Sequence, residues 1–386
     1  MKNKILFIAF SFILMALGAA GQLAVKSGNL QGETVKEEKE SISFADVWSG
    51  KWQGDYENYL EDNLKIREWL IPVRNQIMYS VFKSSPNSNI VIGKNQNLYE
   101  EEYICFETQI YAPMSREEID ILVNKLDIID KALKEKDKKF FIFITPSKAE
   151  IYPEDIPDIY KSVAPKEKAE STYSMFMNAL NQTNIAYYDS TPDVRELKET
   201  SEFHVFPRTG THWSRVTAAI CAGKLADAME EQLGINLPEC KVEYERCSEA
   251  ASPDSDIYNL LNLLEKSDEE YYKPVIEITD SDKEDYAILA RGGSFMGAGL
   301  NGLMIQNNYF SRSYYMENTF AVCPEGTYSG NFDSYDMLPV QEMIVDSDII
   351  FLEVNEEAIP RMSFGFIDYL LDNNILGEED NSELFN

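Results

Sequence analysis

Short apolar runs alternate with amphipathic segments over much of this chain. In 115–139 apolar residues recur at helical spacing, and FFIFITPSK (140–148) follows directly as an apolar run ended by a proline. Ser115, with Glu118 three residues later, predicts the N-terminus of the helix. A helix that leads into such a run is typical of a crossover helix followed by a buried parallel strand.

The same alternation recurs towards the C-terminus. Helices are predicted near 165–182 and over 213–233. Strands are predicted within the apolar runs NIAYYDS (184–190), DYAILARGGSF (285–295) and DSDIIFLEV (346–354). Four or five short strands separated by helices indicate an α/β fold, in which an open, mostly parallel sheet carries helices on both faces.

The N-terminal segment is predicted to enter a membrane. Lys2 and Lys4 precede an apolar, uncharged run that extends to about residue 25. We interpret 1–25 as a signal anchor, the alternative being a cleaved signal peptide, and both place the rest of the chain outside the cytoplasm. The polar stretch 26–43 then reads as a tether.

The remainder, 44–386, is predicted to form one large domain. Helical spacing of aromatic and aliphatic residues over 44–82 predicts helices, and NIVIGKNQNLYE (89–100) predicts two short strands around a turn. The stretch 236–285, rich in Glu, Asp and Ser, is expected to be an irregular acidic insertion.

Charge and cysteine content narrow the possible partners. The chain has 35 Lys and Arg against 66 Asp and Glu, a net charge of −31, which disfavours nucleic acid as a partner. The five cysteines show no zinc-ligand spacing, so no metal or other cofactor is indicated. Cys240 and Cys247 are candidates for a local disulfide, and free thiols are the alternative.

Candidate chemistry lies where predicted strands end, because ligands of open α/β sheets gather at the carboxyl ends of the strands. Ser294 follows such a strand behind Gly292 and Gly293, a sequence that suits an exposed nucleophile whose turn offers N–H groups to an oxyanion. A simple surface turn is the alternative. Lys148, after another strand, is a candidate substrate contact or a surface lysine.

The chain has only two histidines, and one of them precedes a predicted helix. His212 lies between Thr211 and Trp213, with Thr209 or Thr211 available as the helix cap. A helix N-terminus disfavours the imidazolium, so His212 is predicted to be a neutral ring able to act as a general base. Packing against Trp213 is the alternative, and His204 is interpreted as a loop residue.

These two stretches resemble a known family. RTGTHWS (208–214) and GGSF (292–295) are similar to the motifs KTDTHW and GDSF of the SGNH-hydrolase-like alginate O-acetyltransferases. The resemblance extends over roughly residues 45–370. It implies an SGNH-like three-layer sandwich. The candidate oxyanion or substrate residues are Gly292, Gly293, Lys148, Thr211 and Trp213.

The resemblance also implies a function. In such proteins a membrane-bound O-acyltransferase passes acetyl groups outward, and the SGNH-like protein places them on hydroxyls of an exported polysaccharide. Here Ser294 is expected to carry the acetyl ester and His212 to activate the serine. A carbohydrate acetylesterase, a transferase of another acyl group such as D-alanine, and a catalytically silent glycan-binding or acyltransferase-partner protein are the alternatives.

Two departures from the motifs leave the third catalytic group open. The motif aspartates are replaced by Gly210 and Gly293, so the carboxylate that would orient His212 has to come from another segment. Asp189, just past the predicted strand IAYY, is the first candidate, and Glu202 is the second. If neither serves, Gly210→Asp is expected to raise activity.

Overall fold

The computed structural model divides the chain into two compact units. Unit 1 comprises residues 1–92 and 257–268, and unit 2 comprises 93–256 and 269–386. The structure describes residues 30–32, 44–63, 67–279, 284–317, 320–323, 326–329 and 335–377. The predicted anchor lies outside these residues, as does nearly all of the predicted tether. No helix in the described ranges has the length and apolar content needed to cross a bilayer.

Unit 1 is built on helices, as the spacing over 44–82 predicts. They are α2 (Phe44–Ser49), α3 (Lys51–Asn63) and α4 (Arg67–Ser80), followed by strand β1 (Ile90–Ile92). The buried amide of Asn75 on α4 donates to the carbonyl of Leu261 at 2.8 Å. The neighbouring Gln76 side chain accepts from the backbone of Leu264 and Glu265, so α4 holds the 257–268 segment by side-chain amides.

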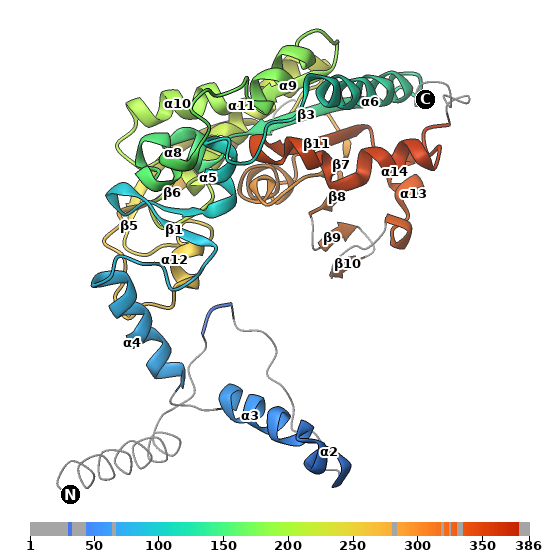
Figure 1. The fold of residues 1–386 in the computed structure, drawn as a ribbon. Coiled ribbons are helices and arrows are strands. Elements are labelled where there is room, and N and C mark those ends of the chain that lie inside the picture. The colour runs from blue at the N-terminus through green and yellow to red at the C-terminus, as the bar shows by residue number, and fades with distance from the viewer. Residues whose placement is uncertain are drawn as a thin grey trace, which may run out of the picture. The chain divides into compact units, whose positions relative to one another are not determined.

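Unit 2 is organised around a seven-stranded sheet of order β10-β9-β8-β7-β11-β3-β4. The five strands from β8 to β4 run parallel, whereas β9 and β10 continue the edge antiparallel. The predicted strands correspond to β3, β4, β7 and β11, which confirms the mostly parallel α/β fold (Figure 1). Their bounds are β3 Lys139–Thr145, β4 Ala186–Asp189, β7 Ala287–Arg291, β8 Arg312–Met316, β9 Phe320–Cys323, β10 Gly326–Ser329 and β11 Ile349–Asn355.

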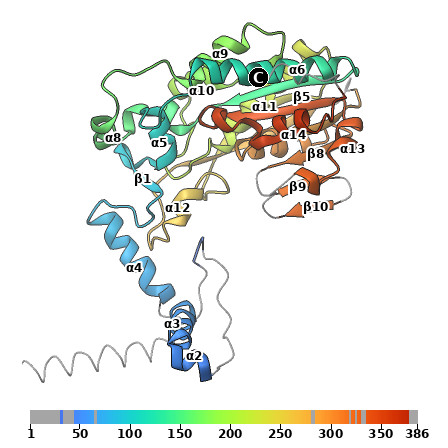
Figure 2. The ribbon, with the colours of Figure 1, turned by 45° about the vertical axis from the view of Figure 1, so that its right-hand side comes forward.

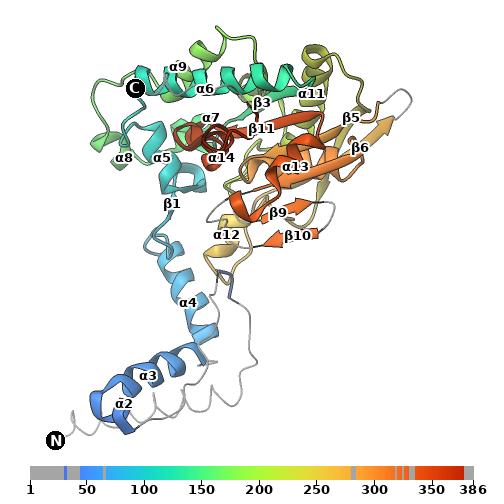
Figure 3. The ribbon, with the colours of Figure 1, turned by 90° about the vertical axis from the view of Figure 1, so that its right-hand side faces the viewer.

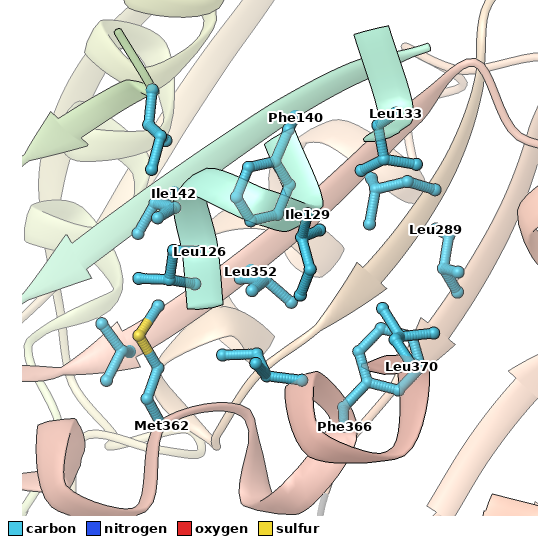
Figure 4. Packing of buried hydrophobic residues seen from close by; sticks show 14 of the residues in the cluster. Leu126, Ile129, Leu133, Phe140, Ile142, Leu289, Leu352, Met362, Phe366 and Leu370 are labelled. Atoms are coloured by element: carbon cyan, nitrogen blue, oxygen red, sulfur yellow. The ribbon is translucent and has the colours of Figure 1, made fainter. Parts of the chain in front are cut away.

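One face of this sheet is covered by α6 (Arg116–Lys134), α9 (Thr172–Leu180), α13 (Val340–Val345) and α14 (Phe366–Asp372). The capping box predicted for Ser115 and Glu118 is present at the start of α6. Helices α6 and α9 lie side by side (Figure 2). Leucines and isoleucines of α6 pack onto alternate residues of the central strands, beside Phe366 and Leu370 of α14 (Figure 4).

The opposite face is covered by α11 (Arg215–Leu233) and the π-helix η3 (Gly297–Ile305). Phe141 and Phe143 of β3 point to this side, because successive residues of a strand face opposite ways. Phe143 packs against the fully buried Trp213, with ring centroids 6.1 Å apart. The sheet is therefore the middle of three layers, and the loop that carries His212 is anchored on its α11 face.

The acidic stretch 236–285 is more regular than predicted. It contains β5 (Glu239–Cys247) and β6 (Tyr271–Thr279), which pair antiparallel along their whole length (Figure 3). Its cysteines are free thiols. Cys240 and Cys247 lie at opposite ends of β5, about 23 Å apart at the rise of an extended strand, so the suggested disulfide is excluded.

Shorter elements connect these layers. Strand β2 (Leu98–Glu100) follows the turn at η1 (Lys94–Gln96), where two short strands were predicted around a turn. The remaining elements are α5 Glu101–Glu107, α7 Lys148–Ile151, η2 Pro153–Asp155, α8 Asp158–Val163, α10 Thr191–Thr200, α12 Asp256–Leu260, η4 Tyr335–Met337 and η5 Glu356–Gly365.

Candidate active site

Ser294 and His212 meet at the carboxyl edge of the sheet. Ser294 lies three residues beyond the end of β7, in the turn that leads into η3. Its Oγ is 2.7 Å from Nε2 of His212, a hydrogen-bonding distance. The other ring nitrogen of His212, Nδ1, pairs with Oδ2 of Asp256. The three side chains form a continuous serine–histidine–carboxylate chain, the arrangement that activates a hydroxyl nucleophile.

The loop that carries His212 ends at a different cap from the one predicted. Ser214, not Thr209 or Thr211, is the N-cap of α11, and its Oγ accepts from the N–H of Thr217 at 3.1 Å. His212 therefore lies two residues before the N-cap residue of α11. Its orientation is set by Asp256, whose second oxygen also accepts from the backbone N–H of Thr211 at 2.9 Å.

Asp256 reaches this position because the segment before it docks on the histidine loop. The carboxylate of Asp254, 1% exposed, accepts from both the backbone N–H and Nε of Arg215, at 3.0 and 2.9 Å. The carbonyl of Asp254 accepts from Oγ1 of Thr209 at 2.7 Å. An added Cβ at Gly210 would lie 3.1 Å from the carbonyl oxygen of Pro253, so glycine lets the segment approach closely.

Asp189, predicted first as the orienting acid, lies elsewhere. It ends β4, three strands from β7 in the sheet and therefore about 14 Å away at ~4.8 Å per strand. Its carboxylate accepts from the Tyr173 hydroxyl at 2.6 Å and from the N–H of Thr191 at 3.0 Å. Glu202, the second candidate, is exposed. The carboxylate that pairs with Nδ1 of His212 is that of Asp256, and not that of Asp189 or Glu202.

Lys148, predicted to contact substrate, is instead a buried support of the histidine loop. Its side chain is 2% exposed, and Nζ donates to the carbonyls of Pro207, Arg208 and Gly210 at 2.7, 3.2 and 2.9 Å. Burial lowers the pKa of this amine to about 7, although Glu269, Asp256 and Asp155 oppose the shift. The alternative of a surface lysine is equally wrong.

The two glycines before Ser294 also have internal partners. The N–H of Gly292 donates to the carbonyl of Met316 at 3.1 Å, and the N–H of Gly293 donates to Oε2 of Glu353 at 2.7 Å. Neither amide is left to hold an oxyanion, contrary to the prediction. A Cβ at Gly292 would lie 2.7 Å from Cβ of Glu353, so only glycine allows this contact.

Glu353 is the buried carboxylate of the nucleophile turn. It projects from the middle of β11, is 1% exposed, and also accepts from Oγ1 of Thr145 at 2.8 Å. Burial raises its pKa to about 7, with the hydrogen bonds from Thr145 and Gly293 acting in the opposite direction. Glu353 is the single charged residue of the strand IIFLEVN, a signal that could have marked it as a buried functional or supporting group.

The remaining predicted contacts, Thr211 and Trp213, face inward. Trp213 is fully buried and packs on Phe295, with ring centroids 5.8 Å apart, and Thr211 is 5% exposed. Phe295 also contacts the ring of His212 at 4.9 Å between centroids. These residues pack behind His212 and do not line the cavity beside it. His204, as predicted, is a loop residue; its Nδ1 lies 2.7 Å from Glu269.

Two further carboxylates border the imidazole. Burial raises the pKa of Glu100 and of Glu317, and a positive charge on His212 would lower both again. Both carboxylates therefore interact electrostatically with the ring of His212.

A cavity of about 490 Å³ opens beside the serine and histidine. Most of its wall is apolar, and the groups able to hydrogen-bond are few. It is lined by His212, Arg215, Ala219, Ser252, Pro253, Pro274, Ile276, Ser294, Gly297, Gly302 and Leu303. Within the part of the chain that the structure describes, no cluster of His, Cys, Asp and Glu is arranged to hold a metal ion.

Comparison with known proteins agrees with this architecture. The family model of the SGNH hydrolase-like domain, acetyltransferase AlgX, matches residues 90–288, which are 199 of the 386 residues. The probable alginate O-acetylase AlgJ of Pseudomonas syringae pv. tomato is 26% identical over 230 residues, 59% of this chain and 53% of the relative. That of Azotobacter vinelandii is 25% identical over 195 residues, 50% of this chain and 46% of the relative. The chain thus spans about half the length of these relatives.

Two solved structures match this chain at low sequence identity. The O-acetyltransferase domain of Pseudomonas putida AlgJ is 18% identical with a TM-score of 0.45, covering 70% of this chain and 92% of that chain. Pseudomonas aeruginosa AlgX is 14% identical with a TM-score of 0.45, covering 72% of this chain and 67% of that chain.

Proposed function

Because the chain belongs to the family of SGNH hydrolase-like AlgX acetyltransferase domains, we propose that it is an O-acetyltransferase acting on polysaccharide hydroxyls. The acetyl group passes through an ester on Ser294. The observation that carries the proposal is the unbroken chain from Ser294 Oγ through His212 to Asp256. A protein that only binds glycan has no need of a serine held at 2.7 Å from an oriented imidazole.

The first half-reaction forms the acyl-enzyme. Ser294 Oγ attacks the carbonyl carbon of the acetyl donor while His212 Nε2 takes the hydroxyl proton, and Asp256 stabilises the resulting imidazolium. The N–H of Ser294 is the donor that we assign to the oxyanion, since the amides of Gly292 and Gly293 are occupied. The bond from the carbonyl carbon to the leaving oxygen then breaks, and that oxygen receives the proton from His212.

The second half-reaction reverses these roles. A sugar hydroxyl takes the place of the leaving group, and His212 removes its proton as its oxygen attacks the acetyl carbonyl. The ester bond to Ser294 breaks, Oγ recovers its proton from His212, and the acetylated sugar departs. Water in place of the sugar would give acetate, which is the esterase alternative.

The location and partners follow from the N-terminal sequence and the family. The basic, apolar segment 1–25 is proposed to anchor the chain with its folded part outside the cytoplasm. Acetyl groups would then come from a membrane-bound O-acyltransferase, because cytoplasmic acyl-CoA does not reach that compartment. A reporter enzyme active only outside the cytoplasm, fused after Asn386, tests the orientation: it should be active.

The acyl-enzyme is tested with the full-length chain and p-nitrophenyl acetate. Mass spectrometry of peptides from quenched protein should find one acetyl group on Ser294, and Ser294→Ala should lose release of p-nitrophenol by about 10³-fold or more. Ser162→Ala, at an exposed serine of α8 that does not line the cavity, is the matched control and should retain turnover. Equal turnover by wild type and Ser294→Ala would refute the proposal.

Transfer is separated from hydrolysis by adding acceptors. Neutral and uronic oligosaccharides are supplied with the ester, and acetylated sugar is measured against free acetate. Acetylated sugar that depends on Ser294 supports the transferase. Acetate alone, with every acceptor unmodified, would identify the chain as an esterase.

A further inference from the structure

Three carboxylates surround the catalytic imidazole. Asp256 pairs with Nδ1 of His212, and Glu100 accepts a hydrogen bond from the side chain of Thr211. Glu317, the first residue after the end of β8, interacts electrostatically with the same ring. Even a protonated imidazole would balance only one of these charges, so negative charge predominates beside the reacting serine.

Glu317 is the carboxylate of this group that lies against the cavity wall. Its Oε1 would be 3.5 Å from a Cβ added at Gly297, and Gly297 lines the cavity together with Ser294 and His212. The hydroxyl of Tyr315 donates to the same oxygen and holds the side chain there. Because β7 and β8 are neighbouring parallel strands, Glu317 and Ser294 lie at the same edge of the sheet. A sugar that presents a hydroxyl to Ser294 therefore comes close to this carboxylate.

Three positive side chains near the catalytic pair are already engaged. Arg215, which lines the cavity, is bound by the buried carboxylate of Asp254 at 2.9 Å. Lys148 and Arg291 are 2% and 3% exposed, and both donate to backbone carbonyls. A sugar carboxylate that entered the site would lose water without gaining one of these cations as a partner, which is costly. A neutral sugar avoids this cost.

We propose that the acceptor is a neutral polysaccharide, and that Glu317 determines this specificity by repelling sugars that carry a carboxylate. The inference rests on the proposed function, because it concerns the sugar that receives the acetyl group from Ser294. A repulsive group of this kind separates two otherwise similar ligands without any new contact to the preferred one. The net charge of −31 acts in the same direction over longer distances.

The experiment uses the full-length chain, p-nitrophenyl acetate as the acetyl donor, and two matched acceptors. These are a uronic oligosaccharide and the methyl ester of the same oligosaccharide, which keeps the rings and hydroxyls but removes the charge. Burial raises the pKa of Glu317, so the assay is run at about pH 8, where the carboxylate is ionised. At low ionic strength, kcat/KM of the wild type for the methyl ester should exceed that for the uronic oligosaccharide by about tenfold or more.

The variants locate the source of this ratio. Glu317→Gln removes the charge and keeps the shape of the side chain, so the ratio should fall to about threefold. Glu342→Gln, at an exposed glutamate of α13, removes the same charge away from the cavity and should keep the wild-type ratio. Taking the ratio of two acceptors within each variant cancels any effect on acylation of Ser294.

Salt supplies a second signature of a charge effect. Raising NaCl from about 0.01 M to about 0.3 M should lower the wild-type ratio, because the shorter screening length weakens the repulsion. The ratio of Glu317→Gln should change less over the same range. A role of Glu317 in packing alone would leave the wild-type ratio independent of salt.

The failures of this inference and of the proposed function are distinguishable. If Ser294 is acetylated and the two acceptors are modified at equal rates, the acceptor inference is refuted and the proposed function stands. A ratio that Glu317→Gln leaves unchanged would refute the role of Glu317 in the same way. If acetate is the only product and neither acceptor is modified, the transferase itself is refuted, and this inference falls with it.

Discussion

The turn that carries Ser294 and the loop that carries His212 are held by buried ions of opposite sign. At the serine turn, the carboxylate of Glu353 binds a backbone N–H. At the histidine loop, the amine of Lys148 binds three backbone carbonyls. Glu353 lies on strand β11, and Lys148 lies three residues beyond the end of β3, at the start of α7. Neither side chain lines the cavity.

The difference in sign follows from what each loop exposes. A tight glycine turn after a strand leaves N–H groups without partners, and a carboxylate is the strongest acceptor for them. The irregular loop before α11 leaves carbonyls directed at one point, and an ammonium group supplies three donors there. The geometry of the two loops is thereby fixed by groups on the rigid sheet, so side chains that do not line the cavity set the 2.7 Å contact.

The same comparison explains the two glycines found where the family motifs have aspartates. Asp256 lies against the His212 loop near Gly210, and Glu353 lies against the Ser294 turn near Gly293. A Cβ at Gly293 would be 3.5 Å from Oε2 of Glu353. At each loop, a carboxylate from a distant segment of the chain therefore lies close to the position where the family motif has an aspartate.

The largest effect is expected at the carboxylate of the histidine loop. Asp256→Asn should lower kcat by about 10³-fold, because the amide cannot stabilise the imidazolium and favours the wrong ring tautomer. Turnover of p-nitrophenyl acetate measures the loss. Asp189→Asn is the control and should stay within about twofold, since Asp189 is bound to Tyr173 and Thr191. A loss at Asp189 comparable to that at Asp256 would return the acid role to the earlier candidate.

A smaller loss is expected from removing the ion behind the same loop. Lys148→Met keeps the chain length but leaves three carbonyls without their shared donor, which should lower kcat about 10- to 100-fold with little change in KM. Unfolding in denaturant should show a loss of about 3 kcal/mol.

The control for Lys148 is an exposed lysine. Lys166→Met, on the exposed segment before α9, should change neither turnover nor stability beyond about 0.5 kcal/mol. If Lys148→Met were destabilised yet kept full kcat, the lysine would support the fold without positioning His212.

Restoring the motif aspartate should weaken activity. Gly210→Asp places a Cβ 3.1–3.2 Å from the carbonyl oxygens of Pro253 and Asp254, and its carboxylate would be repelled by both. The segment that carries Asp256 should shift, lowering turnover of the acetate ester about tenfold. Gly210→Ala, which adds the Cβ without the charge, should lose less. A gain in activity from Gly210→Asp would mean that Asp256 does not serve as the orienting acid.

How far the sequence could predict this site depends on the range of each interaction. Apolar runs and helix caps are local, so the parallel strands β3, β4, β7 and β11 and the start of α6 are found from pattern. The pairing of Ser294 with His212 came from motifs that resemble a family. Asp256 lies in an acidic stretch with no periodic signal. Its position beside His212 depends on the ion pair between Asp254 and Arg215. Such packing between distant segments leaves no mark in spacing or composition.

The smallest effect is the pH dependence of the free energy of unfolding, to which Glu353 and Lys148 should contribute in adjacent pH ranges. Burial raises the pKa of Glu353 from 4.5 to about 7 and lowers that of Lys148 from 10.5 to about 7. Between pH 4.5 and 7 the folded chain holds the Glu353 proton that the unfolded chain has lost, so this group makes the unfolding free energy fall as pH rises. Between pH 7 and 10.5 the unfolded chain holds the Lys148 proton, so that free energy rises with pH.

Glu353→Gln isolates the lower window, because glutamine can accept from the N–H of Gly293 and donate to the hydroxyl of Thr145 without a charge. Its unfolding free energy in denaturant, relative to wild type, should increase by about 2 kcal/mol from pH 5 to pH 7 and stay level from pH 7 to pH 9. Lys148→Met should show the complementary pattern: a constant difference from wild type below pH 7 and a growing deficit above it. A difference between Glu353→Gln and wild type that does not vary with pH would show that Glu353 has the same pKa folded and unfolded. The serine turn would then be held by a carboxylate that is ionised throughout this pH range, and only Lys148 would make stability depend on pH.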